Sequence, residues 1–231
     1  MDIEWELLLK KVQNSIESYA KPNYKNAYKL EELYYWYYIA KWMAQDAKNN
    51  TVTTVLDVGC GHGTLSVFAK EIYNCEVVSV DVTNYLSPKM VRDFELNYIL
   101  CDIETEIQEI YEKEAYDRIL LTEVLEHLYY NPVPTLFNLK SMLKKNGKLF
   151  LSTPDMVEWG FIGKYYNHVG EMPNPKEVKK PEFSSIDEHI YHYTYGECNR
   201  IIAESGFKIN GFEYCKLGSR ARHLNYELMK R

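Results

Sequence analysis

Apolar residues in the first 50 positions recur with the 3.6-residue period of a helix. One such stripe would pack on a core and consists of Leu33, Trp36, Tyr37, Ala40, Met43, Ala44 and Ala47. From position 52 the pattern changes to short β-branched runs separated by helical stretches. The chain is therefore predicted to have an N-terminal helical cap over residues 1–50 and an α/β domain over residues 51–231.

Five short apolar runs in the second part predict strands. They cover residues 52–58, 76–81, 95–101, 117–122 and 148–153. Strands that alternate with helices form right-handed crossovers, which place the strands parallel in one sheet. Two further strands, 207–217 and 223–229, are joined by a short turn around 218–221 and must be antiparallel. The fold class is thus α/β, with five parallel strands and an antiparallel edge pair.

Residues 155–193 break this alternation. The segment is rich in glycine, proline and aromatic residues and shows no clear periodicity. The chain as a whole contains 21 tyrosines and four tryptophans, more aromatic surface than a small core needs. We expect an aromatic, lid-like insertion that faces Tyr35 and its aromatic neighbours in the cap and excludes water from a site.

Composition excludes several classes of protein. No run of about 18 apolar residues predicts a membrane span, and the acidic start Met1-Asp2-Ile3-Glu4 is unlike a secretory signal. Five cysteines without CxxC spacing do not form a full disulfide framework and fit a reducing, cytoplasmic location. The net charge of −6 disfavours nucleic acid as a partner.

A glycine loop between the first strand and the next helix is the main candidate for chemistry. It reads Val55-Leu56-Asp57-Val58-Gly59-Cys60-Gly61-His62-Gly63. Glycines at such a turn let a ligand approach the backbone. Asp81 ends the second strand, where an acid can accept both ribose hydroxyls of a nucleoside. Asp102 follows the third strand, within reach of an adenine amino group. Together these residues predict a nucleoside-binding site.

The same residues resemble the class I S-adenosylmethionine (SAM)-dependent methyltransferases. The D-V-G-C-G-x-G loop, Asp81, Asp102, the K-N-G-K-L-F-L-S-T-P strand and the antiparallel last strand are similar to that family, in its small-molecule branch near the ubiquinone-pathway O-methyltransferases. The resemblance implies a Rossmann-like sheet and SAM as the cofactor. It assigns Asp57, Gly59, Gly61 and Gly63 to the methionine end of SAM, Asp81 to the ribose, Asp102 and Ile103 to the adenine, and Thr122 and Glu123 to the border of the site.

The acceptor is less constrained than the cofactor. Glu123, Glu126 and His127 follow the fourth strand with a spacing that puts Glu123 on one helical face with either neighbour. This E-V-L-E-H segment occurs in the small-molecule branch. In RNA 3′-end 2′-O-methyltransferases, E-x-x-E-H together with a distant histidine, here His189, binds a divalent metal. We favour a small-metabolite or sugar-like acceptor and assign no metal ligand. A nucleoside-binding scaffold without turnover is a third hypothesis.

Methyl transfer from a sulfonium is an in-line displacement, so the site must align the acceptor and exclude water. Alignment contributes up to roughly 7–11 kcal/mol to lowering the barrier. A hydroxyl acceptor also loses a proton, and a neutral histidine suits that task. His127 and His189 are the candidate bases. The sequence leaves open O- or N-methylation, the identity of the acceptor and the oligomeric state.

Overall fold

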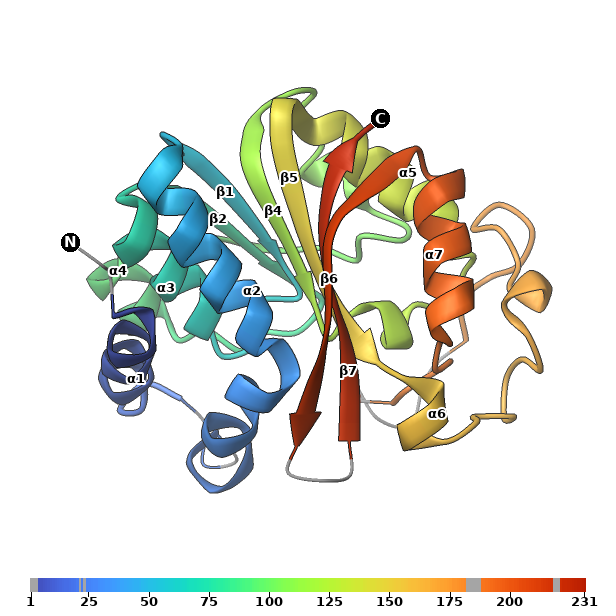
Figure 1. Cartoon of the computed structure of the whole chain (residues 1–231), viewed down its shortest axis with the longest axis horizontal. Helices are drawn as coiled ribbons and strands as arrows, with labels where there is room; N and C mark the ends of the chain where they lie inside the picture. Colours follow the sequence, from blue (N-terminus) through green and yellow to red (C-terminus); the bar gives the residue numbers. More distant parts are fainter. Residues whose placement is uncertain (1–3, 21, 23, 182–187, 218–220) are drawn as a thin grey trace.

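Seven strands form one sheet that carries helices on both faces (Figure 1). The structure is a computed structural model that describes residues 4–20, 22, 24–181, 188–217 and 221–231. The strands are β1 (Thr54–Val58), β2 (Glu76–Asp81), β3 (Asn97–Leu100), β4 (Tyr116–Thr122), β5 (Leu143–Pro154), β6 (Phe207–Leu217) and β7 (Ala221–Lys230). The α-helices are α1 (Trp5–Ile16), α2 (Lys29–Asn49), α3 (Thr64–Tyr73), α4 (Pro88–Asp93), α5 (Pro132–Met142), α6 (Met156–Trp159) and α7 (Tyr195–Glu204). Short π or 3-10 turns are η1 (Tyr24–Tyr28), η2 (Ile107–Glu109), η3 (Leu125–His127) and η4 (Val169–Glu171).

The strand order is β3-β2-β1-β4-β5-β7-β6. The first five strands in this order are parallel, and β7 pairs antiparallel with both β5 and β6. This confirms the predicted sheet, although residues 218–220 of the predicted turn lie outside the described residues. The chain leaves β1 toward β2 on one side and later returns to β4 on the other. Such a switch point opens a crevice at the carboxyl ends of the central strands.

The sheet separates two apolar cores because successive side chains of a strand point to opposite faces. On β1, Leu56 and Val58 join the core that contains α5 and α7, whereas Val55 joins the core that contains α1, α2 and α3. The prediction that a stripe of the N-terminal helix packs on the core is confirmed for Trp36, Ala40, Met43 and Ala44, which are buried.

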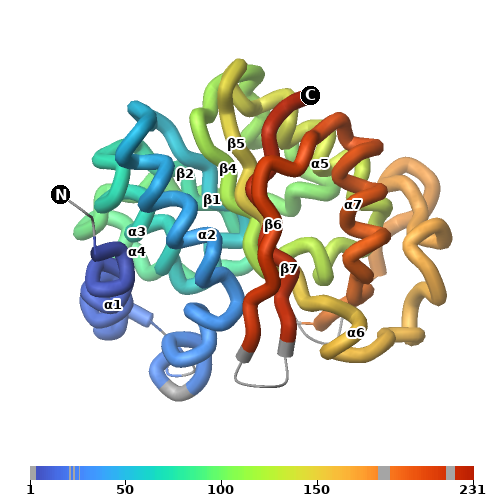
Figure 2. The backbone as a smooth tube through the Cα atoms, in the orientation of Figure 1, coloured from blue at the N-terminus to red at the C-terminus, as the bar shows by residue number. Residues whose placement is uncertain are grey.

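Helix α2 lies against the hairpin of β6 and β7, far away in sequence (Figure 2). The helix is kinked at Trp36, whose backbone has φ −138° and ψ 37°. The carbonyl of Tyr35 accepts a hydrogen bond of 2.8 Å from Asn225 Nδ2 of β7. A side chain that takes a helical carbonyl out of the regular ladder is a known cause of kinks. The kink turns the start of α2 toward the carboxyl ends of the strands.

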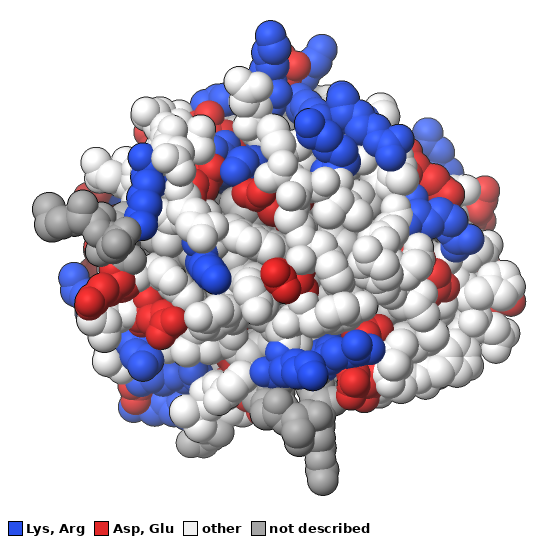
Figure 3. Space-filling view, viewed as in Figure 1, with Lys and Arg blue, Asp and Glu red and all other residues white. Residues whose placement is uncertain are grey.

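Charge is mixed on the face that carries α2 and the β6–β7 hairpin. Figure 3 shows lysines and arginines mainly along its upper rim and in a short band below its centre, with acidic residues between them. Among the residues drawn in colour, no broad basic surface crosses this face. None of the helices in the described part of the chain has the length and apolar character that a membrane crossing requires.

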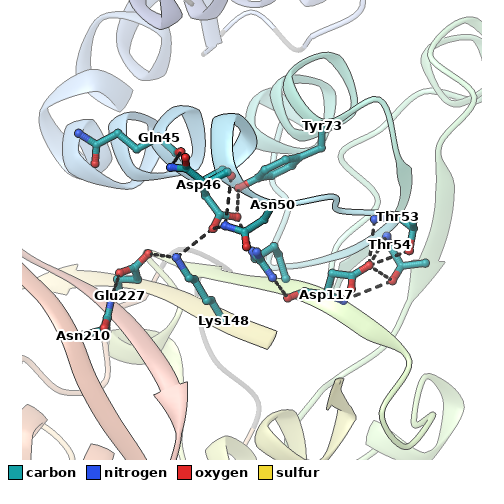
Figure 4. Close-up of polar contacts among 12 residues, drawn as sticks. Gln45, Asp46, Asn50, Thr53, Thr54, Tyr73, Asp117, Lys148, Asn210 and Glu227 are labelled. Carbon is teal, nitrogen blue, oxygen red and sulfur yellow. Dashed lines mark hydrogen bonds and ion pairs between the residues drawn. The ribbon is translucent and has the colours of Figure 1, made fainter. Parts of the chain in front are cut away.

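A buried ion-pair network ties α2 to the sheet at the end away from the crevice (Figure 4). Asp46 forms ion pairs with Arg118 (Oδ2 to Nε, 2.5 Å) and with Lys148 (Oδ1 to Nζ, 2.9 Å). Lys148 Nζ also lies 2.7 Å from Glu227 Oε1. Burial raises the pKa of Asp46, but the bonds from Arg118 and Lys148 outweigh it and hold that pKa below its usual value. The network therefore joins α2, β4, β5 and β7.

The bounds of several strands differ from the prediction, most of all those of β5. β5 begins at Leu143 instead of residue 148 and extends to Pro154, which lies opposite His223 of β7. β3 begins at Asn97 instead of residue 95. Glu95 has a φ of 49°, and the amide of Leu96 bonds back to the carbonyl of Val91, so the chain is still turning there. A positive φ is incompatible with an extended strand.

Candidate active site

A cavity of about 310 Å³ lies in the crevice at the carboxyl ends of β1, β2 and β4. This size falls at the lower end of the range for small-molecule sites. Its lining includes Gly59 and Gly61 of the glycine loop, Asp81 at the end of β2, and Glu123 after β4. Segments from α2, the insertion and β7 complete the wall. The cavity thus lies where parallel α/β sheets bind ligands.

The glycine loop is shaped by close backbone packing. Gly59 has a φ of 71°, and a Cβ built there would lie 2.2 Å from Val124 Cγ2. No larger residue fits this position without moving the segment after β4. Gly61 lines the cavity, whereas Gly63 caps α3 and packs on Met90 and Leu86. The loop therefore presents Gly59 and Gly61 to a ligand and uses Gly63 for packing.

The acids at the carboxyl ends of β2 and β3 are held by backbone amides. Asp81 accepts hydrogen bonds from the amides of Gly61 (2.9 Å) and Thr83 (2.8 Å). Asp102 accepts one from the amide of Glu104 at 2.9 Å and pairs with Lys180 Nζ at 3.0 Å. Both carboxylates are thus oriented within the cavity lining. Lys180 belongs to the insertion and brings that segment to the same end of the cavity.

Two further carboxyl groups lie at the glycine-loop end. Asp57 is 1% exposed, and its Oδ2 accepts a hydrogen bond of 2.6 Å from Ser66. Glu32 of α2 is 6% exposed and accepts hydrogen bonds from Thr64 (2.7 Å) and Gln13 (2.8 Å). Burial raises the pKa of each group to about 7. A cation bound at this end of the cavity would allow both groups to ionise.

The opposite end carries Glu123 and Glu126. Glu123 has a φ of 53° and accepts hydrogen bonds from Ser152 Oγ and His223 Nδ1 at 2.7 and 2.8 Å. Glu126 is 1% exposed, and burial followed by the charge of Glu123 raises its pKa. The predicted shared helical face is wrong, because the positive φ keeps Glu123 outside the single 3-10 turn Leu125–His127. Both side chains nevertheless line the cavity.

The insertion delivers His189 beside His127. The carbonyl of Glu126 accepts the amides of Ile190 at 2.7 Å and Tyr191 at 3.2 Å, which docks the insertion's end onto η3. The rings of His127 and His189 then lie 4.8 Å apart between centroids. Trp159 packs within 5.9 Å of the His189 ring and 5.4 Å of the His223 ring. An imidazole cluster thus forms between the insertion, η3 and β7.

Hydrogen bonds orient these imidazoles. His127 Nδ1 lies 3.0 Å from the carbonyl of Glu188, and His192 Nδ1 lies 2.8 Å from the carbonyl of Gly160. A carbonyl only accepts, so each Nδ1 carries the proton and each Nε2 of a neutral ring keeps a lone pair. His189 Nδ1 must then donate to His192 Nε2, 2.7 Å away. His127 Nε2 lies 3.8 Å from Glu126 Oε1, and the Nε2 of the neutral His189 ring keeps its lone pair.

The donor atoms of Glu126, His127 and His189 all lie within 4.8 Å of one another. Two imidazoles and one carboxylate are suitable ligands for a divalent transition metal. Metal-binding histidines usually donate a hydrogen bond from their other ring nitrogen to a fixed acceptor, as His127 and His189 do here with Nδ1. The residues present therefore fit a divalent cation, although we assigned no metal ligand from the sequence.

A family model described as a methyltransferase domain matches residues 31–210, more than three quarters of the chain. The chain belongs to the methyltransferase-domain family. This confirms the recognition of the class I, SAM-dependent methyltransferases that the glycine loop and its two acids indicated. The family match covers most of α2, the five parallel strands and the insertion.

Curated relatives align over about half of this methyltransferase. The mitochondrial ubiquinone biosynthesis O-methyltransferase of Candida albicans is 37% identical over 123 residues, which cover 48% of this chain and 36% of the relative. The histone-arginine methyltransferase CARMER of Culex quinquefasciatus is 32% identical over 117 residues, 49% of this chain and 19% of the relative. The aligned part thus spans well under half of the length of either relative.

Solved structures show the same fold. A Burkholderia thailandensis 1,6-didemethyltoxoflavin-N1-methyltransferase, solved with 1,6-didemethyltoxoflavin and S-adenosylhomocysteine (SAH), superposes with a TM-score of 0.63 at 16% identity and covers 97% of this chain and 89% of that one. A magnesium protoporphyrin IX methyltransferase from Synechocystis with bound SAH gives a TM-score of 0.57 at 16% identity, with 84% and 80% coverage. At these identities the likeness supports the fold alone.

The structure brings nearly all residues predicted for the site into one cavity. Its lining contains Asp57, Gly59, Gly61, Asp81, Asp102, Ile103, Thr122, Glu123, His127 and His189. Sequence patterns did not point to Glu32, Lys180 or His223, which also line it. These three come from α2, the insertion and β7, and none directly follows a parallel strand in the sequence.

The prediction that aromatic residues of the cap and the insertion face one site is confirmed in part. Tyr35 of α2 and Trp159 of the insertion line the cavity and both contact the His223 ring. Tyr166, Tyr191 and Tyr193 are instead buried in the core under the insertion. Only part of the aromatic excess therefore borders the site.

Proposed function

We propose that this chain is an enzyme that transfers a methyl group from SAM to a hydroxyl oxygen of a small, sugar-like acceptor. SAM supplies an electrophilic methyl carbon attached to a sulfonium. Asp81 would receive the ribose hydroxyls, Asp102 and Ile103 the adenine, and the loop at Gly59 and Gly61 the methionine portion. The family and the lining of the cavity support this placement.

The convergence of His127, His189 and Glu126 at the far end of the cavity carries the choice of a hydroxyl. An amine attacks with its own lone pair, whereas a hydroxyl needs a group that takes its proton. Burial, followed by the neighbouring His127, lowers the pKa of His189 to about 3, so His189 is a weak base. We therefore assign proton removal to His127 and orientation of the hydroxyl to the His189 lone pair.

Stacking and desolvation support a small acceptor. Trp159 is 39% exposed at the cavity mouth and faces the imidazole cluster, which suits a sugar or flat ring. Among the described lining residues, Lys180 is the only lysine or arginine, and it is paired with Asp102 and Glu104. A polyanion would gain little from this lining.

A second candidate is metal-dependent methylation of the ribose 2′-oxygen at RNA 3′ ends. The grouping of Glu126, His127 and His189 favours it, because three donor atoms of suitable type converge. A cation held there would lower the pKa of an acceptor hydroxyl and remove the need for a strong base.

Calorimetric titration with SAH, with and without Mn²⁺, tests both candidates. We expect micromolar binding of SAH, followed by methylation of a small hydroxyl acceptor in a screen that detects SAH release. Full activity in excess chelator would remove the metal-dependent candidate. Activity on RNA 3′ ends that requires Mn²⁺ would replace the small-molecule proposal. SAH binding without turnover on any acceptor would support a nucleoside-binding scaffold.

A further inference from the structure

Glu32 is a buried carboxyl group that α2 brings into the glycine-loop end of the cavity. Its Oε1 accepts a hydrogen bond of 2.7 Å from Thr64, the first residue of α3. Its Oε2 accepts one of 2.8 Å from Gln13 of α1 and a longer one of 3.3 Å from Tyr24. Glu32 lines the same cavity as Gly59 and Gly61. The side chain is thus fixed by neutral donors and faces the predicted methionine subsite.

No lysine or arginine of the described lining balances the charge at this end. Lys180 is paired with acids at the adenine end, and Lys29, whose charge acts on Glu32, directs its ammonium to Glu17 at 2.5 Å. Asp57 lines the same end, and its buried Oδ1 has no hydrogen-bond partner among the described residues. Two desolvated carboxyl groups, those of Glu32 and Asp57, therefore line the cavity without a lysine or arginine of the lining paired to either of them. Burying such groups is costly unless a cation accompanies them.

We propose that Glu32, together with Asp57, recognises the α-ammonium group of the cofactor's amino-acid portion. An ammonium has three donors and no acceptor, which suits two carboxyl groups with free lone pairs. The assignment rests on the proposed function, because it takes SAM and SAH as the ligands. It gives the N-terminal helices a direct part in cofactor recognition in addition to their packing on the sheet.

Two ligands that differ only at the ammonium isolate this contact. The probes are SAH and its desamino analogue, in which a hydrogen replaces the α-amino group. Their affinities are measured by calorimetry for the wild type, Glu32→Gln and Glu31→Gln. The Glu31 variant is a matched control. It removes a carboxylate from the residue directly before Glu32 in α2, and Glu31 does not line the cavity.

The wild type and Glu31→Gln should prefer SAH over the desamino analogue by tenfold or more. Glu32→Gln should reduce that preference to less than threefold and bind the analogue as the wild type does. The ratio of the two affinities does not depend on the folded fraction, so partial unfolding of a variant would lower both values equally. An unchanged ratio in Glu32→Gln would overturn the proposal. Failure of the wild type to bind either ligand would instead overturn the proposed function.

Discussion

His189 Nδ1 lies 2.7 Å from His192 Nε2, and His192 is itself oriented by the carbonyl of Gly160. This relay fixes the ring of His189 with its remaining nitrogen toward the cavity. His192 does not line the cavity, so it acts through His189 as a positioning residue.

Replacing His192 by alanine should therefore lower kcat by roughly tenfold, which is typical when the partner of an active-site imidazole is removed. The KM for SAM should change less than twofold, because the cofactor residues are untouched. Steady-state kinetics with the acceptor found in the screen measure both constants. His168→Ala is the control, since His168 pairs with Glu171 outside the cavity. Equal kcat values for the two variants would contradict the positioning role.

His127→Ala should remove the proton acceptor. General bases contribute roughly a factor of 10² to 10⁴, so kcat should fall by that amount while SAH affinity stays within twofold. Single-turnover kinetics and calorimetry on the same preparation separate chemistry from binding. A variant with wild-type turnover would show that another group takes the proton.

Asp81→Ala should weaken SAH binding by at least tenfold. Each hydrogen bond from a ligand to a carboxylate contributes about 1.5–3 kcal/mol, and Asp81 is placed to accept two from the ribose. Because Asp81 also holds the amide of Gly61 at 2.9 Å, a thermal unfolding scan must accompany the titration. Unchanged affinity in a folded variant would refute the ribose assignment.

The raised pKa of Glu32, about 7 against an ordinary 4.5, makes the stability of the ligand-free protein depend on pH. The folded state holds this proton more tightly than the unfolded state. The stability it contributes is therefore complete below about pH 4.5 and is lost as the pH rises through 7.

Urea unfolding at pH 5 and pH 8 measures this effect. Wild type should lose more stability across the interval than Glu32→Gln, by a difference on the order of 3 kcal/mol. Asp57 has a pKa shifted in the same direction and remains in both proteins, so some loss should persist in the variant. Identical losses would show that Glu32 is already ionised in the folded protein.

Asp46→Ala should destabilise the fold by about 3–5 kcal/mol, because it leaves Arg118 and Lys148 buried without their shared partner. The exposed pair of Lys89 and Asp93 provides the comparison, and Asp93→Ala should cost no more than about 1 kcal/mol. Urea titrations at neutral pH give both values. Similar costs for the two changes would mean that the network of Asp46 adds nothing beyond a surface pair.

Local pattern was sufficient to predict the sheet and the shared cavity of the residues assigned to the cofactor. Asp81 ends one parallel strand, Asp102 comes shortly after another, and the glycine loop links β1 to α3, so position in the chain predicts position in space. His189 also lines the cavity, in the segment that precedes α7, and Thr194 and Glu197 form the cap of that helix.

The remaining residues depend on long-range packing that no local period encodes. Glu32 lies within a helix whose buried face also includes ordinary core residues, so its carboxyl group resembled a surface position. His223 reaches the site because β7 inserts between β5 and β6. The conformation of Glu123 follows from close packing between Val124 and Gly59, a contact across 65 positions that spacing alone does not reveal.

The contact between α2 and the β6–β7 hairpin limits when the chain can complete its folding during synthesis. Helix α2 emerges from the ribosome early, yet the groups that satisfy Asp46 and the carbonyl of Tyr35 include Lys148 of β5 and Asn225 of β7. Such non-local pairing requires closing a loop of nearly the whole chain, and folds of this kind form slowly. Until residues 221–230 are synthesised, α2 lacks its final packing surface and the kink at Trp36 lacks its partner. A nascent chain should therefore become competent to hold its ligand only after β7 has left the ribosomal exit tunnel.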